Sequence, residues 1–294
     1  MDFDFSGVGV ALVTPFGGDG GIDFAALERL VDSVIEGGAD YLVALGTTAE
    51  TPALSAGEKA DVAACIRSAN AGRKPMIIGI GGNCTASVVH DLQTADTAGF
   101  SAVLSVAPYY NKPSQRGLYL HYKAVAEASP LPVVLYNVPG RTSVNIEAAT
   151  AVSLAYDCPN IVAIKEASGK MEQIKAVIDG APAGFRVISG DDSLALPVIE
   201  MGGVGVISVA ANVFTVEFCR MIHKALDGDT ASASRMFADM ERAISLLFRE
   251  GNPTGVKTAL AVKGMIEPHL RLPLVFGSEL LYGQLSHVIK EKHL

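Results

Sequence analysis

Short apolar runs alternate along the chain with longer segments whose apolar residues recur three and four positions apart. The first run covers residues 8–13, and the segment 24–35 then has helical spacing. Runs that are predominantly apolar suit strands buried on both faces of a parallel sheet. Eight such runs occur, at 8–13, 41–45, 76–80, 102–106, 133–136, 161–165, 186–189 and 204–209. Eight strand–helix units predict an α/β fold, a (β/α)8 TIM barrel, which takes roughly 250 residues.

Two helix starts carry capping signals. Asp23 is a candidate N-cap, and Ser55 with Glu58 forms a candidate capping box. The helix of the third unit is expected over 85–98, and that of the fifth unit near 146–155.

The segment 228–294 predicts further helices at 237–248, 255–265 and 279–289. No Ser/Pro-rich linker precedes it. We therefore expect a barrel over 1–227 and a C-terminal helical extension over 228–294 packed on that barrel.

Composition narrows the function classes. The 294 residues are 49% hydrophobic and 18% charged with a net charge of −8, and no Lys/Arg cluster stands out, which argues against nucleic-acid binding. The six histidines show no metal-binding spacing, so we expect no metal and no cofactor. The four cysteines form no C-x-x-C pair and are expected to be reduced core residues. No signal peptide and no apolar run of about 18 residues is present, so we expect a cytoplasmic protein with no membrane partner.

One lysine ends an apolar run. In a strand over 161–166, Ile161, Ala163 and Lys165 point to one face because successive side chains alternate. Burial disfavours the charged ammonium, and a neutral amine can attack a carbonyl carbon and form a Schiff base. A strand-end lysine that reaches into water is the alternative, and this stretch alone leaves it open.

In barrels of this type the active site lies at the carboxyl ends of the strands. The polar residues that follow the apolar runs are Thr14, Thr47, Thr48, Asn83, Tyr109, Tyr110, Tyr136, Asn137, Arg141, Lys165, Ser189, Gly190 and Ser208. Phenol and hydroxyl groups suit proton transfer around a Schiff base, and Tyr136, Thr47 and Tyr110 are the candidates. A carboxylate substrate needs N–H donors, which Arg141 or the backbone of Thr47 and Thr48 could supply. Taken singly, each residue also has a structural explanation as a turn, cap or surface group.

Several motifs occur together in order between about residues 5 and 285. They are GVGVALVTPF from Gly7, GTTAET from Gly46, PYYNKPSQ from Pro108, YNVPGRT from Tyr136, VAIKEAS from Val162 and SGDD from Ser189. In this combination the chain resembles the pyruvate-dependent Schiff-base lyases and aldolases. The resemblance implies condensation of pyruvate with L-aspartate 4-semialdehyde, a step toward diaminopimelate and lysine.

The resemblance also implies catalytic roles. Lys165 matches the lysine that forms the Schiff base, and Tyr136 matches the phenol that relays protons. Thr47 matches the hydroxyl that links this phenol to Tyr110, which in the family comes from a neighbouring subunit. We therefore expect a homo-oligomer, either a dimer or a tetramer built as a dimer of dimers.

Four further positions match substrate-binding residues of the family. Arg141 matches the group that receives the semialdehyde carboxylate, Thr48 lies where pyruvate's carboxylate is held, and Gly190 and Ile207 match backbone positions lining the pocket. Arg141 favours this branch over sister enzymes acting on N-acetylneuraminate or 2-keto-3-deoxy acids. These sister aldolases are the alternative, followed remotely by a non-catalytic keto-acid-binding barrel.

Two departures from the family pattern bear on the loop after the second strand and on regulation. Ala49 replaces a usual glycine, and we expect the loop to accommodate it. In lysine-inhibited members an effector site offers histidines and an acid. Asn83 and Tyr109 are retained at this candidate effector site, but Ala56, Lys59 and Ser87 occupy the other matching positions. We expect lysine inhibition to be weak or absent.

Overall fold

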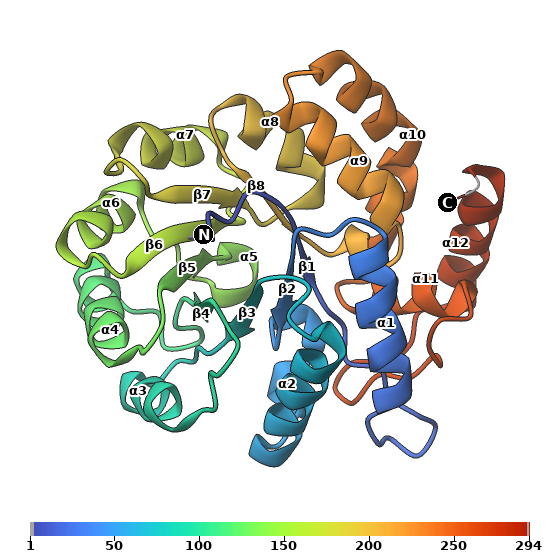
Figure 1. Ribbon diagram of the computed structural model, residues 1–294, viewed down its shortest axis with the longest axis horizontal. Helices are drawn as coiled ribbons and strands as arrows, with labels where there is room; N and C mark the ends of the chain where they lie inside the picture. Colours follow the sequence, from blue (N-terminus) through green and yellow to red (C-terminus); the bar gives the residue numbers. More distant parts are fainter. Residues whose placement is uncertain (1–2, 293) are drawn as a thin grey trace. The chain divides into compact units, whose positions relative to one another are not determined.

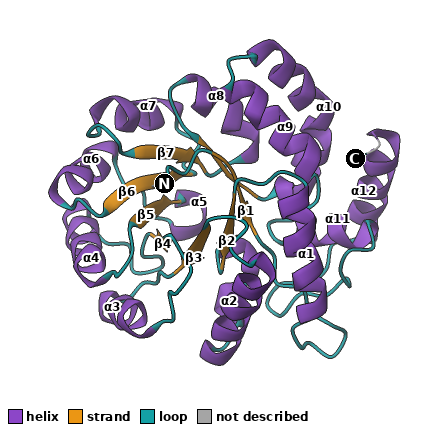
Figure 2. Cartoon of the chain, viewed as in Figure 1, coloured by secondary structure: helices purple, strands orange, loops and turns teal. Residues whose placement is uncertain are grey.

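The computed structural model describes residues 3–292 and 294, and its eight strands close into one barrel in chain order (Figures 1 and 2). The strands are β1 (Gly7–Ala11), β2 (Tyr41–Ala44), β3 (Met76–Gly79), β4 (Ala102–Val106), β5 (Val133–Asn137), β6 (Ile161–Glu166), β7 (Arg186–Ser189) and β8 (Gly205–Ser208). Almost every strand residue is buried, as a parallel barrel with helices outside it requires. The predicted (β/α)8 barrel is confirmed.

Twelve helices are described between and after the strands. They are α1 (Phe24–Glu36), α2 (Ala56–Asn70), α3 (Thr85–Thr94), α4 (Gln115–Ala128), α5 (Pro139–Thr142), α6 (Ala148–Asp157), α7 (Met171–Gly180), α8 (Ala195–Glu200), α9 (Thr215–Leu226), α10 (Thr230–Arg249), α11 (Thr254–Val262) and α12 (Glu279–Lys292). Four short 3-10 turns complete the set: η1 (Thr47–Ala49), η2 (Thr51–Ala53), η3 (Asp192–Leu194) and η4 (Ala210–Asn212).

The chain separates into two compact units. The first contains the described residues up to Ser6 together with Pro75–Ile207. In it, β3 to β7 pair in parallel with their neighbours, and α3, α4, α6 and α7 lie on the outer side of these strands (Figure 1). The pairing of β5 with β6 sets Tyr136 opposite Lys165 and Asn137 opposite Glu166. The register therefore brings two predicted site residues to adjacent positions.

The second unit contains Gly7–Lys74 and Ser208–Leu294. In it β1 pairs in parallel with β2, α1 packs on α2, and α9, α10, α11 and α12 pack on one another. Asn212 joins η4 to β1, because its Nδ2 donates to the carbonyl of Ala11 and its Oδ1 accepts from the Val13 N–H. The helices after residue 228 are thus built into this unit, while a domain boundary at 227/228 stays a prediction.

The predicted caps of two helices are present. Asp23 accepts a hydrogen bond from the Ala26 N–H at the start of α1. Ser55 and Glu58 form the reciprocal capping box of α2. Both caps satisfy N–H groups that have no partner within their helix.

Several helix boundaries differ from the sequence prediction, among them those of α3, α6 and α10. Helix α3 ends at Thr94 rather than near residue 98, because Ala95 is extended. Helix α6 begins at Ala148, since the N–H of Ile146 donates to Asn137 Oδ1 instead of joining the helix. Helix α10 begins seven residues before the predicted 237, where Asp229 accepts from the Ser232 N–H.

The cysteines correct one expectation. Cys158 and Cys219 are buried as predicted, but Cys65 is half-buried and Cys84 is exposed. All four are free thiols. Within the described part of the chain, no helix has both the length and the apolar character needed to cross a membrane.

Candidate active site

Lys165 lies near the carboxyl end of β6 with its side chain in the protein interior. The residue is 5% exposed, and its Nζ lies 4.4 Å from the centre of the Tyr136 ring. Tyr136 is itself buried and is the strand partner of Lys165 in β5. The inward direction predicted from alternation is confirmed, and the amine faces a phenol ring rather than water.

Gly190, directly after β7, lies close to the side chain of Lys165. A Cβ at position 190 would lie 2.7 Å from the Ala167 Cβ and 3.1 Å from both Cγ and Cε of Lys165. Contacts this short would push the lysine stem aside, so glycine leaves room for it. The Gly190 N–H also donates to the carbonyl of Glu166, at 2.8 Å. Ile207, another predicted pocket residue, is fully buried in β8.

Thr47 and Thr48 form the turn η1 in the second unit. Thr48 is buried, and its Oγ1 accepts a 3.0 Å hydrogen bond from Asn252 Nδ2. The next carbonyl, of Ala49, accepts from Thr14 Oγ1 at 2.8 Å. The loop is therefore held by the segment that follows β1 and by the turn before α11. Asn252 was not anticipated, because nothing in the sequence around it marks a partner 204 residues away.

A buried ion pair closes the same loop. Glu50 adopts a left-handed conformation with φ of 55°, and its Oε1 lies 2.5 Å from Lys257 Nζ. Both side chains are almost completely buried, and the N–H of Arg271 donates to the other Glu50 oxygen. Burial lowers the pKa of Lys257 to about 8, while the Glu50 carboxylate opposes this shift. Lys257 was also missed by the sequence reasoning, since an isolated helical lysine gives no sign of burial.

Ala49 fits its loop without strain. The residue ends η1 and is buried. The left-handed backbone conformation in this loop is adopted by the next residue, Glu50, and not by Ala49. The expected accommodation of alanine at this position is confirmed.

The other predicted residues lie on more exposed segments. Arg141 is exposed in the short helix α5, which follows β5. Tyr110 is 87% exposed and has a φ of 73°. Tyr109 is also exposed, and beside it Asn111 Nδ2 donates to the carbonyl of Asn83. Two further residues of the candidate effector site lie in first helical turns, with Ser87 exposed in α3 and Lys59 half-buried in α2.

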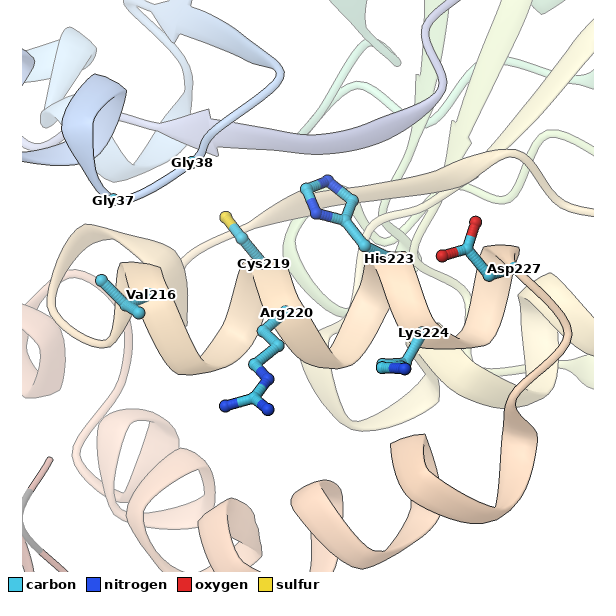
Figure 3. A pocket seen from close by; sticks show the side chains of 8 residues that line it. All are labelled: Gly37, Gly38, Val216, Cys219, Arg220, His223, Lys224 and Asp227. Carbon is cyan, nitrogen blue, oxygen red and sulfur yellow. The ribbon is translucent and has the colours of Figure 1, made fainter.

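A separate pocket lies over α9 in the second unit (Figure 3). The two potentially reactive side chains in this pocket are not activated. His223 Nε2 already lies 2.7 Å from Asp40 Oδ2, and burial raises the pKa of the Cys219 thiol to about 12. A protonated thiol is a poor nucleophile. None of the predicted site residues lines this pocket.

No metal-binding group of three His, Cys, Asp or Glu side chains is found among residues 3–292 and 294. The reactive group that stands out is instead the buried amine beside a phenol at the end of a barrel strand. Such an arrangement suits the capture of a carbonyl compound as a Schiff base.

Comparisons with known proteins agree with this class. The sequence profile of the dihydrodipicolinate synthetase family matches residues 4–292. The 4-hydroxy-tetrahydrodipicolinate synthase of Parabacteroides distasonis is 49% identical over 290 residues, covering 99% of this chain and 98% of its own. That of Phocaeicola vulgatus is 54% identical over 269 residues, covering 92% and 91%.

A solved structure is similarly close. The dihydrodipicolinate synthase of Acinetobacter baumannii, complexed with pyruvate, is 41% identical with a TM-score of 0.95, covering 98% of this chain and 99% of its own. The chain therefore belongs to the dihydrodipicolinate synthetase family.

Proposed function

We propose that this enzyme condenses pyruvate with L-aspartate 4-semialdehyde to give 4-hydroxy-tetrahydrodipicolinate, through a Schiff base on Lys165. The observation that carries the proposal is the buried Lys165 amine, 4.4 Å from the centre of the Tyr136 ring. Family membership and the names of the relatives support the same reaction.

The chemistry follows from the amine. The lone pair of Lys165 Nζ attacks the ketone carbon of pyruvate, and loss of water from the carbinolamine leaves an iminium ion. Loss of a methyl proton gives an enamine, whose carbon attacks the aldehyde carbon of the semialdehyde. The amino group of the adduct then displaces Lys165 from the imine carbon and closes the ring. One water is released overall, and the enzyme regains its free lysine.

Each step needs protons moved to or from an oxygen, nitrogen or carbon. Tyr136 is the proposed donor and acceptor, because its ring already faces Lys165. Thr47 and Tyr110 are the proposed continuation of this relay, with Tyr110 supplied by a neighbouring subunit. Its 87% exposure in the single chain supports such a role.

Substrate binding is assigned to four residues. Arg141 is proposed to receive the semialdehyde carboxylate through its guanidinium fork, which suits planar carboxylates. Thr48 is proposed to hold the pyruvate carboxylate, and the hydrogen bond from Asn252 fixes its hydroxyl. Gly190 and Ile207 are proposed to line the pocket with backbone atoms, and the crowding around Gly190 supports its closeness to Lys165.

Assembly, location and regulation are part of the same proposal. We infer a homo-oligomer, a dimer or a dimer of dimers, that acts in the cytoplasm. Asn83, Ser87, Tyr109 and Lys59 are proposed as an effector site that binds lysine weakly or not at all, because this set contains a cation and no acid, and like charges repel.

Trapping with borohydride tests the central step. Pyruvate with borohydride should leave a permanent adduct on the peptide that carries Lys165, and Lys165→Ala should lose the adduct and nearly all turnover. Lys170→Ala, which removes an exposed lysine five residues away, is the matched control and should keep both.

Two results would contradict the proposal. An unmodified Lys165 in active enzyme would exclude the Schiff base at this residue. A sugar-derived aldehyde that outperforms the semialdehyde as acceptor would assign the enzyme to the sister aldolases instead.

A further inference from the structure

Glu166 is a buried carboxylate next to the Schiff-base lysine. It is 1% exposed, and alternation along β6 sends its side chain to the face opposite that of Lys165. Among the described residues, Glu166 takes part in no ion pair. A buried carboxylate is costly unless hydrogen bonds compensate for its lost hydration.

Neutral N–H groups supply these hydrogen bonds. Asn137 Nδ2 lies 3.1 and 3.0 Å from the two carboxylate oxygens of Glu166. Gln173 Nε2 donates to Oε2 at 3.0 Å, and the Ser168 N–H donates to Oε1 at 2.7 Å. A carboxylate can accept all of these bonds because it has two acceptor oxygens and, when ionised, no proton of its own.

The network extends to the segment before α6. Asn145 and Gln173 exchange hydrogen bonds through their side-chain amides, at 2.7 and 3.2 Å. Asn137 Nδ2 also lies 3.0 Å from Asn145 Oδ1, and Asn137 Oδ1 accepts from the Ile146 N–H at 2.9 Å. The ends of β5 and β6, the start of α7 and the segment before α6 are thereby joined around one carboxylate.

The position of this network gives it a consequence for the reaction. Asn137 and Glu166 are strand partners, and each directly follows a residue of the other partner pair, Tyr136 and Lys165. Hydrogen bonds that fix Asn137 and Glu166 therefore also fix the backbone that presents Tyr136 and Lys165. A misplacement of about 1 Å in a reacting group can cost about 100-fold in rate.

We propose that Glu166 is a positioning residue for Schiff-base formation, acting through Asn137 and Gln173 to hold the Lys165 amine against the Tyr136 phenol. This inference rests on the proposed function, in which Lys165 is the nucleophile. It adds a residue on the face of β6 opposite that of Lys165, whose role is to set the geometry of the amine.

The first test is Glu166→Gln. Its amide has one acceptor oxygen, and its NH₂ group would face the donating NH₂ groups of Asn137 or Gln173. We expect kcat, and the rate of adduct trapping with pyruvate and borohydride, to fall together by about 10- to 100-fold. The KM for the semialdehyde should stay within about threefold, because none of the residues in the network is proposed to bind the semialdehyde. Circular dichroism and the Tm establish that the variant is folded.

A charge swap separates positioning from bulk stability. The double variant Glu166→Gln/Gln173→Glu restores one carboxylate and one amide at adjacent positions, and it should regain about tenfold of the lost kcat. Glu172→Gln, which changes an exposed carboxylate beside Gln173, is the matched control and should behave like the unmodified enzyme. If Glu166→Gln does not fold, Gln173→Met removes one donor from a half-buried position and should lower kcat by about three- to tenfold.

Three results would overturn the proposed role of Glu166. Folded Glu166→Gln with unchanged kcat and trapping rate overturns the proposal, as does a swap variant with full structural stability and no recovery. If Glu166→Gln does not fold, an unchanged Gln173→Met overturns it. Failure of the proposed function looks different, because the unmodified enzyme would then show no adduct on Lys165.

Discussion

At the residue scale, neighbouring side chains determine where the amine of Lys165 lies. Its stem passes beside position 190, where only a glycine leaves space, and its amine ends over the ring of Tyr136. Alternation in β6 predicts the direction of Lys165 and equally predicts that Glu166 points the other way. The sequence did not reveal the importance of Glu166, because its partners come from β5 and α7.

His121 gives a prediction at the residue scale. It is buried in α4, its Nδ1 lies 2.9 Å from Thr85 Oγ1, and its Nε2 has no hydrogen-bond partner among the residues that the structure describes. Burial lowers the pKa of His121 to about 4, whereas an exposed histidine titrates near 6.5. Between these values the unfolded chain binds a proton that the folded protein does not, so stability falls as the pH falls from about 6.5 to 4.

The measurement compares unfolding at different pH values. We expect His121 to account for about 1–2 kcal/mol of stability lost between pH 7 and pH 5. His121→Asn should flatten the pH dependence of the free energy of unfolding in urea by that amount. His90→Asn, at an exposed site on α3, is the control. Equal slopes for His121→Asn and the unmodified protein would contradict the prediction.

At the scale of elements, the C-terminal helices support the loop after β2. The turn before α11 supplies Asn252 to Thr48, and α11 itself supplies Lys257 to Glu50. The sequence predicted these helices from periodicity and described them as an extension. Their side-chain contacts in the second unit add that they hold a loop carrying two predicted site residues, Thr47 and Thr48.

Helix starts also bear on regulation. Ser87 and Lys59 lie in the first turns of α3 and α2, where the helix dipole is positive. The set itself contains no acid, and Glu58, the neighbour of Lys59, is already paired with Arg271 and with the Ser55 N–H. Lysine at concentrations equal to those of the substrates should therefore leave the reaction rate nearly unchanged.

Steady-state rates with added lysine check this expectation. Lys59→Glu, which puts an acid in place of the cation, should make the enzyme more sensitive to lysine. Strong inhibition of the unmodified enzyme at low lysine concentration would refute the proposal for the effector site.

At the scale of the whole molecule, Tyr110 points to assembly. It is a large side chain, 87% exposed, on a left-handed backbone that is strained for a tyrosine. Such strain is often kept where a residue has a function. The proposed relay through a neighbouring subunit gives Tyr110 that function.

Analytical ultracentrifugation combined with assays tests this assembly. We expect a dimer or larger species at assay concentrations, with specific activity falling on dilution into monomers. Tyr110→Phe should lower kcat without changing the mass of the assembly, while Tyr156→Phe, at another exposed tyrosine on α6, should change neither. A fully active monomer would rule out the shared relay.

The sequence by itself determined the order of strands and helices, because alternating apolar runs and helical spacing are local patterns. It also determined the inward direction of Lys165 and two of the helix caps. The sequence did not predict where α3 ends or where α10 begins. Single residues decide these boundaries, through the extended backbone of Ala95 and the capping side chain of Asp229.

Only the tertiary structure decided which distant side chains meet. The burial of Lys257 against Glu50, the hydrogen bond from Asn252 to Thr48 and the amide network around Glu166 join residues 7 to 207 positions apart. No local pattern encodes such pairs. A polar residue is expected to be exposed, and it can be buried only where another residue, often far along the chain, forms a hydrogen bond with it. The sequence thus marked Lys165 as the proposed nucleophile, and the fold placed Tyr136 and the network around Glu166 beside it.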